Sequence, residues 1–203
     1  LLSTEADLRY FTGFLTRFWE SPTRPWYLVV PAKGDPIAVI PSIGAALMAR
    51  TWISDIRTWR APDLDDDGIG LLAETLRTLG PRIGTPSGLQ SHLRMPLDDF
   101  GRLNAALPKP IGADAGILRS LRLVKSDAEI EKIKTACHIA TRAFERVPEI
   151  ARVGQPLAAV FRDFQRLCLE EGADWVPYLA GAAAQGGYGD VISPADDRPL
   201  TTG

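Results

Sequence analysis

Histidine and cysteine are scarce in this 203-residue chain, which contains two of each: His92, His138, Cys137 and Cys168. A zinc site needs three or four ligands, and neither histidine has a second histidine or cysteine beside it at metal-binding spacing. We therefore expect both histidines to be structural. Both cysteines fall on apolar faces of predicted helices. That placement indicates buried, reduced thiols and favours a cytoplasmic location.

Long apolar runs and an excess of charge of one sign are also missing. No apolar stretch approaches the ~18 residues of a membrane span. No secretory signal is visible, although the chain begins without a methionine. The net charge is −2, and lysines and arginines are scattered rather than gathered in a stripe. We therefore expect neither nucleic acid nor a membrane as a partner.

The common catalytic signatures are absent as well. The sequence has no G-x-S-x-G elbow and no phosphate-binding P-loop, and the Gly-rich stretch 181–189 does not match G-x-G-x-x-G. The acidic stretch DLDDD at residues 63–67 is typical of a solvated surface and helix N-cap region. A cation site is the remote alternative. The residues alone indicate no complete active site.

Strand and helix patterns alternate through the first 120 residues. Residues 1–13 have the pattern of a strand end that runs into a helix, so we expect the natural chain to begin earlier. The predicted strands are 26–31, 36–41, 52–59 and the short RIGTP segment at 82–86. The predicted helices are 42–51, 68–80 and 95–107. This alternation predicts an α/β layered domain.

A helix with clear start signals is predicted after Ser126, where the alternation of strand and helix patterns gives way to helical patterns. Ser126 and Glu129 form an S-x-x-E capping box, and acidic residues in the first turn suit the helix dipole. Apolar residues then recur at three- and four-residue steps, at Ile130, Ile133, Cys137, Ala140, Phe144 and Val147. This stripe predicts a helix over 127–151 packed on a core. A second helix is expected at 156–172, and residues 175–179 have the composition of a strand.

The segment GFLTRFWESPTRPW at residues 13–26 looks functional. It connects a predicted helix to a predicted strand and carries four aromatic residues with Arg17 and Arg24. Aromatic and arginine side chains are typical of interfaces and anion-binding sites. The alternative is a structural loop whose aromatic rings fold back onto the sheet.

Three stretches together resemble one family. The pattern RLVKSxxEIxxIKxA at residues 122–136 resembles the junction in creatinase, prolidase and aminopeptidase P between an N-terminal domain and the "pita-bread" catalytic domain. DLRYFTGF at residues 7–14 is similar to a landmark of that N-terminal domain, and residues 187–203 resemble the approach to the first metal-ligand strand. The resemblance implies a creatinase-like α/β domain over 1–121, a mixed sheet flanked by helices. The first helices of an α+β pita-bread domain would follow over 122–203.

The resemblance also implies an activity. Enzymes of this family are metal-dependent hydrolases that use two divalent ions, commonly manganese, cobalt or zinc, to cleave an amide bond, usually the one before a proline. The segment with the metal ligands would begin just after Gly203, so we assign no metal ligand within this chain. The family's peptidases carry a histidine before that segment, whereas none occurs between Trp175 and Gly203.

Three functions therefore stay open. The leading one is hydrolysis of an Xaa-Pro peptide or a related amide, and the missing histidine favours a creatinase-like reaction on a small non-peptide C–N bond. A non-catalytic pita-bread binding protein is the alternative from another class.

The resemblance further implies a set of substrate contacts. Residues 13–26 lie where creatinase-like enzymes reach from one subunit into the active site of the other. Arg24 is the closest match to the arginine that binds a substrate carboxylate in creatinase, and a guanidinium can hold a carboxylate through two parallel hydrogen bonds. Trp19, Arg17 and Tyr188 are further candidates. We therefore expect a homodimer that binds a peptide or a small amide.

Overall fold

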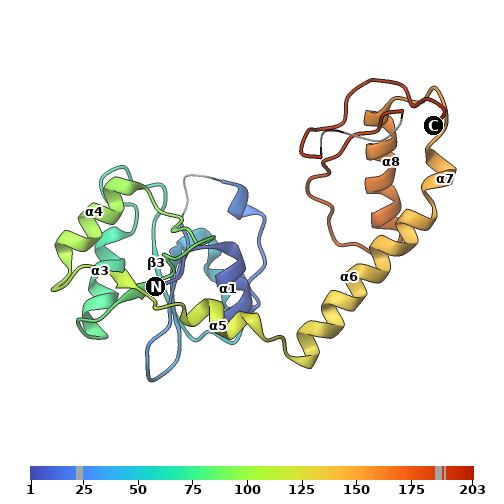
Figure 1. Cartoon of the computed structure of the whole chain (residues 1–203). Helices are drawn as coiled ribbons and strands as arrows, with labels where there is room; N and C mark the ends of the chain where they lie inside the picture. The colour runs from blue at the N-terminus through green and yellow to red at the C-terminus, as the bar shows by residue number, and fades with distance from the viewer. Residues whose placement is uncertain (22–24, 186–188, 190) are drawn as a thin grey trace. The chain divides into compact units, whose positions relative to one another are not determined.

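The chain divides into two compact units, Leu1–Leu123 and Val124–Gly203 (Figure 1). The computed structural model describes residues 1–21, 25–185, 189 and 191–203. The first unit contains α1 (Glu5–Thr12), η1 (Phe18–Glu20), β1 (Tyr27–Val29), β2 (Ile37–Pro41), η2 (Ser42–Gly44), α2 (Ala45–Met48), β3 (Asp55–Trp59), α3 (Ile69–Thr78), β4 (Gly84–Thr85), α4 (Leu97–Ala106), β5 (Gly112–Ala113) and α5 (Ile117–Leu123). The second contains α6 (Asp127–Glu145), α7 (Val147–Ile150) and α8 (Leu157–Glu170).

Strands β1, β2 and β3 form a small mixed sheet in that order. The β1–β2 pair is an antiparallel hairpin with Tyr27 opposite Val39, whereas β3 runs parallel to β2 with Asp55 opposite Ile37. A second, two-stranded parallel sheet joins β4 to β5. The mixed sheet with flanking helices confirms the predicted fold class.

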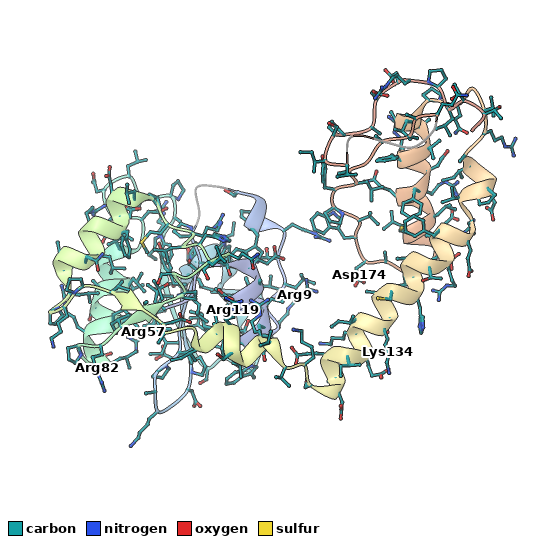
Figure 2. The ribbon with its side chains drawn as sticks, viewed as in Figure 1. Arg9, Arg57, Arg82, Arg119, Lys134 and Asp174 are labelled. Atoms are coloured by element: carbon teal, nitrogen blue, oxygen red, sulfur yellow. The ribbon has the colours of Figure 1, made fainter. Side chains whose placement is uncertain are left out.

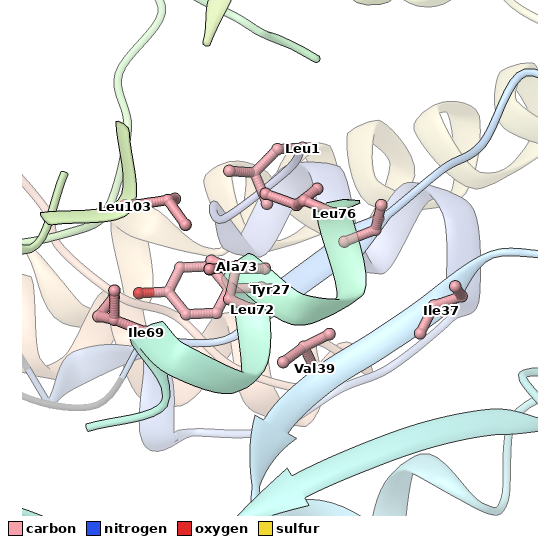
Figure 3. Close-up of a cluster of buried hydrophobic side chains, with 10 residues drawn as sticks. Leu1, Tyr27, Ile37, Val39, Ile69, Leu72, Ala73, Leu76 and Leu103 are labelled. Atoms are coloured by element: carbon pink, nitrogen blue, oxygen red, sulfur yellow. The ribbon is translucent and has the colours of Figure 1, made fainter. Parts of the chain in front are cut away.

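Two hydrophobic clusters make up the core of the first unit. Successive side chains of a strand point to opposite faces, so Tyr27 and Val29 join one cluster and Leu28 joins the other. The first cluster includes apolar residues of α3 and α4, among them Leu72 and Leu103 (Figure 3). The second cluster combines residues of α1, α2 and the 13–26 segment. Burial on both faces explains why β1 and β2 are continuous apolar runs.

Most sequence-based elements of the first unit are confirmed, with shifted ends. The predicted helix 42–51 is a 3₁₀ turn followed by the four-residue helix α2, and the predicted strand 52–59 begins at Asp55. The two-residue strand β5 and the helix α5 were not predicted from the sequence. Both are short, and periodicity over so few residues gives little signal.

Helix α6 begins with the predicted capping box but ends earlier than predicted. The Ser126 N–H donates to Glu129 Oε2 at 2.8 Å, and the Glu129 N–H donates to Ser126 Oγ at 3.4 Å. A single helix over 127–151 is wrong, because α6 stops at Glu145 and α7 starts at Val147. Pro148 explains the break: it has no N–H to donate to the Phe144 carbonyl, and its ring crowds that carbonyl.

The predicted packing of the α6 stripe is also wrong among the residues that the structure describes. Ile130, Ile133 and Phe144 are exposed, and Cys137 is exposed rather than buried. The small core of this unit is built instead from Ala143, Ile150, Val160, Leu167 and Cys168, on α6, α7 and α8. Of the stripe, Phe144 contacts α8, where its ring centroid lies 4.7 Å from that of Phe164, whereas Ile130, Ile133 and Cys137 stay exposed.

The chain after α8 folds back onto the start of that helix without forming a regular strand. The predicted strand at 175–179 is wrong, since this stretch has no strand pairing and contains Pro177, which cannot donate to a ladder. Farther on, the Arg198 carbonyl accepts from the Leu157 N–H at 3.1 Å, and the Asp196 carbonyl accepts from the Ala158 N–H at 2.8 Å. These bonds satisfy the first N–H groups of α8, which begins after Pro156 without a side-chain cap.

Candidate functional site

The aromatic segment that the sequence singled out lies against one face of the mixed sheet. Phe14, Trp19 and Trp26 are buried in the second core cluster, and Phe18 is 40% exposed. The Trp26 ring centroid lies 5.3 Å from that of Phe14 and 6.0 Å from that of Trp19. The structural alternative for this segment, in which its aromatic rings fold back onto the sheet, is therefore confirmed for Phe14, Trp19 and Trp26 but not for Phe18.

Trp26 is held in place by a very close approach to a glycine. A side-chain Cβ at Gly44 would lie 2.1 Å from the Trp26 ring, so no larger residue fits there without displacing the indole. Trp26 immediately precedes β1, and its neighbour Pro25 is also buried. The end of the aromatic segment is thus fixed to the sheet.

The predicted substrate-binding residues occupy different environments. Arg17 is exposed, whereas the Trp19 side chain belongs to the core and is only 9% exposed. Arg24 and Tyr188 lie outside the described residues. The substrate contacts expected for these four residues stay predictions.

A surface pocket of about 360 Å³ lies at the end of the aromatic segment. Pro25 forms one side of it, and the others come from the irregular stretch before α4: His92, Leu93, Arg94, Met95 and Pro96. The lining combines apolar side chains with one imidazole and one guanidinium, which suits a small ligand with an apolar part and an acidic group. His92 was predicted to have a structural role, but its side chain is exposed and lines this pocket.

Arg94 connects the pocket to the aromatic segment. Its Nη2 donates to the Trp19 carbonyl at 3.3 Å and also to the Ser21 carbonyl. The guanidinium carbon lies 5.6 Å from the centroid of the Trp19 ring, within the range of a cation–π contact. Partial burial lowers the pKa of Arg94, although an arginine in this setting stays charged.

Three buried polar groups near the sheet have no hydrogen-bond partner in the described part of the chain: Trp19 Nε1, Trp26 Nε1 and Tyr27 Oη. Burial, followed by the nearby charges of Asp99 and Asp67, raises the pKa of the Tyr27 hydroxyl. The phenol therefore stays protonated at physiological pH, because a phenolate in this apolar cluster would be poorly solvated. Tyr27 is thus a core residue with an unused donor, and it is unsuited to act as a base.

The amino-acid sequence matches a known family over most of its length. Residues 1–124 match the Creatinase/Prolidase N-terminal domain. The chain belongs to this family. The region matched ends one residue after the first compact unit, Leu1–Leu123.

Several similar proteins carry peptidase names. The chain is 28% identical over 192 residues to the probable dipeptidase PepE of Mycobacterium tuberculosis, covering 91% of this chain and 48% of that protein. The structure of dipeptidase PepE from Mycobacterium ulcerans aligns with a TM-score of 0.71 at 26% identity, over 98% of this chain and 51% of that one. X-Pro aminopeptidase from Thermotoga maritima aligns with a TM-score of 0.68 at 22% identity, over 95% and 52%, and shows the shared fold. The chain spans about half the length of the curated relatives it matches.

The creatinase/prolidase resemblance implies a two-metal centre, so the described residues can be tested for a fit. Within residues 1–21, 25–185, 189 and 191–203, no three His, Cys, Asp or Glu side chains lie together as a metal site requires. The acidic stretch 63–67 forms local hydrogen bonds instead: Asp66 accepts from the Gly70 backbone N–H at 3.0 Å, and Asp67 accepts from the Trp59 indole N–H at 2.8 Å. The Asp66 bond to the first turn of α3 agrees with the predicted surface and N-cap region, although the N-cap residue of α3 is Gly68, which has no side-chain acceptor. The described residues do not fit the metal centre.

Helices of the second unit are joined by charged side chains. Arg142 donates to Glu171 at 2.7 Å, and Arg146 forms ion pairs with Glu149, Glu170 and Glu171 at 3.0 to 3.2 Å. These arginines, through hydrogen bonds first, lower the pKa of Glu171, and Arg166 and Arg146 lower that of Glu170. The network joins α6 to the end of α8. No helix in the described part of the chain has the length and apolar character needed to cross a membrane.

Proposed function

We propose that the protein to which this chain belongs hydrolyses a peptide bond, with a dipeptide or an Xaa-Pro peptide as substrate. The family match over residues 1–124 carries this proposal. The peptidase names of similar proteins support it, since one is a probable dipeptidase and another an X-Pro aminopeptidase. The likeness to dipeptidase PepE also extends over 98% of this chain, which includes its second unit.

The proposal includes two divalent ions, manganese, cobalt or zinc, as the resemblance implies. Their ligands would come from a segment of the whole protein other than the residues described, because those residues gather no suitable donors. The first unit would then contribute substrate contacts and assembly rather than the reacting centre.

The proposal also includes a cytoplasmic homodimer in which residues 13–26 contribute to substrate binding. Arg24, Arg17, Trp19 and Tyr188 are the side chains proposed to contact substrate. Replacing Arg24 with alanine in the full-length protein should raise KM about tenfold or more, the loss expected for a charge-assisted hydrogen bond to a carboxylate. Unchanged kinetics on every accepted substrate would remove Arg24 from the site.

One observation favours a second candidate function. No histidine occurs between Trp175 and Gly203, where peptidases of this family carry a histidine that helps to bind and protonate the substrate. A small non-peptide amide, cleaved in a creatinase-like reaction, is the corresponding substrate class.

The deciding experiment is a substrate panel on the full-length protein. Purified protein is stripped with a chelator, reloaded with Mn²⁺, Co²⁺ or Zn²⁺, and incubated with Xaa-Pro dipeptides, dipeptides without proline, and small carboxylate-bearing amides. Metal-dependent release of amino acids from either dipeptide set supports the peptidase. Turnover of the small amides alone supports the second candidate.

A non-catalytic binding protein is the alternative from another class. No turnover of any compound by a correctly folded, metal-reloaded protein would support it and contradict both enzyme proposals. Native mass spectrometry of the same sample reports the oligomer and the bound metal. A monomer would contradict the proposed homodimer.

A further inference from the structure

The backbone of Arg94 is fixed to the edge of the mixed sheet, although it lies outside any helix or strand. The Arg94 N–H donates to Ser3 Oγ at 2.8 Å, and the Ser3 side chain is buried. Leu2, the residue before Ser3, pairs with Leu28 of β1 through two backbone hydrogen bonds of 2.9 Å. The guanidinium of Arg94 is therefore carried on an anchored stretch of chain.

From that anchor, the Arg94 side chain holds the aromatic segment at two carbonyls and one ring. It donates to the carbonyls of Trp19 and Ser21 and lies against the Trp19 indole. A guanidinium can do this because its donors form a planar fork whose face stacks on an aromatic ring. A lysine ammonium offers neither the fork nor the flat face.

The same contacts determine one wall of the pocket. Trp19 packs on Trp26, which directly follows the pocket residue Pro25, and Arg94 itself lines the pocket. Arg94 thus joins the two stretches of chain that form the pocket.

We propose that Arg94 is the positioning residue of this site: it holds Trp19–Ser21 against residues 92–96 and so sets the shape of the pocket at Pro25. This inference rests on the proposed function, because it assumes that the aromatic segment contributes to substrate binding. A purely structural arginine would support stability without any selective effect on substrate affinity.

The first test measures how firmly the aromatic segment is held, independently of activity. Full-length protein is digested with trypsin under native conditions, and cleavage of the Arg17–Phe18 bond is followed by mass spectrometry. Cleavage requires local opening of the segment. The nearby Arg24–Pro25 bond does not interfere, because trypsin cleaves poorly before proline.

Replacing Arg94 with methionine should speed this cleavage about tenfold, which corresponds to ~1.4 kcal/mol less free energy of local closure. Arg82→Met is the matched control, because Arg82 is exposed and has no hydrogen bond or ion pair to any described residue (labelled in Figure 2). The control should be cut at the wild-type rate. Arg94→Lys should give an intermediate rate, and it replaces the methionine variant if that one fails to fold.

The second test separates positioning from the proposed function. On the best substrate of the panel, Arg94→Met should raise KM about tenfold with kcat within twofold, and Arg94→Lys should recover part of the loss. Unchanged cleavage at Arg17–Phe18 in both Arg94 variants would overturn the positioning role. Faster cleavage with unchanged KM would overturn the link to substrate. Failure of the proposed function itself would appear earlier, as a wild-type protein that turns over none of the panel.

Discussion

Strands β1 and β2 of the first unit are buried on both faces, whereas helix α6 of the second unit exposes much of its apolar stripe. The first unit has two clusters of buried side chains, one on each side of the mixed sheet. The second unit has one small cluster, centred on Ala143 and Leu167. Burial of apolar area is the main stabilising contribution to a fold, so the first unit draws more of its stability from this source.

Charge shows the opposite distribution. In the second unit, a connected set of glutamates is shared by three arginines: Arg142 on α6, Arg146 just after α6 and Arg166 on α8. In the first unit the ion pairs form smaller groups: Arg57 pairs with Asp55 on β3, Arg122 pairs with the buried Asp7, and Arg102 pairs with Asp66 and Asp99. The comparison teaches that the second unit, as described, depends on helix caps and surface ion pairs, which respond to pH and salt.

The largest expected effect comes from the core of the first unit. Leu72→Ala should lower the free energy of unfolding by about 3 kcal/mol, because Leu72 is fully buried between α3 and the sheet and a cavity would remain. Leu64→Ala is the matched control at a 99% exposed site and should change it by less than about 0.5 kcal/mol. Urea unfolding measures both. Equal losses would contradict the central role of the two-sided core.

The second-largest expected effect is a loss of stability of the second unit at acid pH. Hydrogen bonds lower the pKa of Glu129, Glu170 and Glu171 below the usual 4.5, so folding favours their ionised forms. Their stabilising effect is therefore complete above pH 4.5 and is lost as the pH falls through the lowered values. Hydrogen exchange followed by mass spectrometry should show α6 and α8 losing protection below about pH 4.5.

A substitution provides the control for this acid response. Glu171→Gln removes one of the lowered carboxyl groups and its pairs with Arg142 and Arg146. The variant should be less protected at pH 7 and should change less between pH 7 and pH 4. An acid response identical to that of the wild type would show that the carboxyl group of Glu171 does not contribute.

Loss of the helix cap should have a smaller effect. Ser126→Ala removes the acceptor of the Glu129 N–H at the start of α6 and should cost about 1 kcal/mol. Ser120→Ala is the control, since Ser120 is an exposed helical serine whose side chain forms no hydrogen bond to any described residue. Thermal unfolding followed by circular dichroism compares the two. A larger loss in Ser120→Ala would reverse the expected order.

The smallest change is a difference in thiol reactivity that leaves the fold intact. Cys137 is exposed on α6, whereas Cys168 is buried and burial raises the pKa of its thiol. A thiol reagent should therefore modify Cys137 in native protein and reach Cys168 only after unfolding. Mass spectrometry of the labelled peptides checks this. Protection of Cys137 would show that another part of the protein covers the α6 stripe.

Local signals in the sequence predicted much of this structure. The capping box at Ser126, the hairpin of β1 and β2 and the helices α3 and α4 all occur where short-range patterns placed them. The error at Pro148 was avoidable, since a proline inside a helical pattern is itself a stop signal. The error at 175–179 had a similar cause, because Pro177 weakens any prediction of a strand there.

The candidate site was predicted less completely. The sequence identified the aromatic segment but gave no sign that Arg94, 75 residues away from Trp19, would hold it. The sequence likewise suggested only a structural role for His92. His92 lines a pocket together with Pro25, a residue far from it in the sequence. Neither position belongs to a periodic pattern, so only the contacts across the fold reveal them.

The sequence by itself determined the approximate positions of α3, α4 and α8, the start of α6, the buried strands β1 and β2, and the family that the chain resembles, because caps, prolines and apolar periodicity act over a few residues. Tertiary structure alone decided which aromatic rings enter the core, which face of α6 is covered and which side chains meet at the pocket. These depend on contacts between residues far apart in the chain, where burial and hydrogen bonding outweigh local preference.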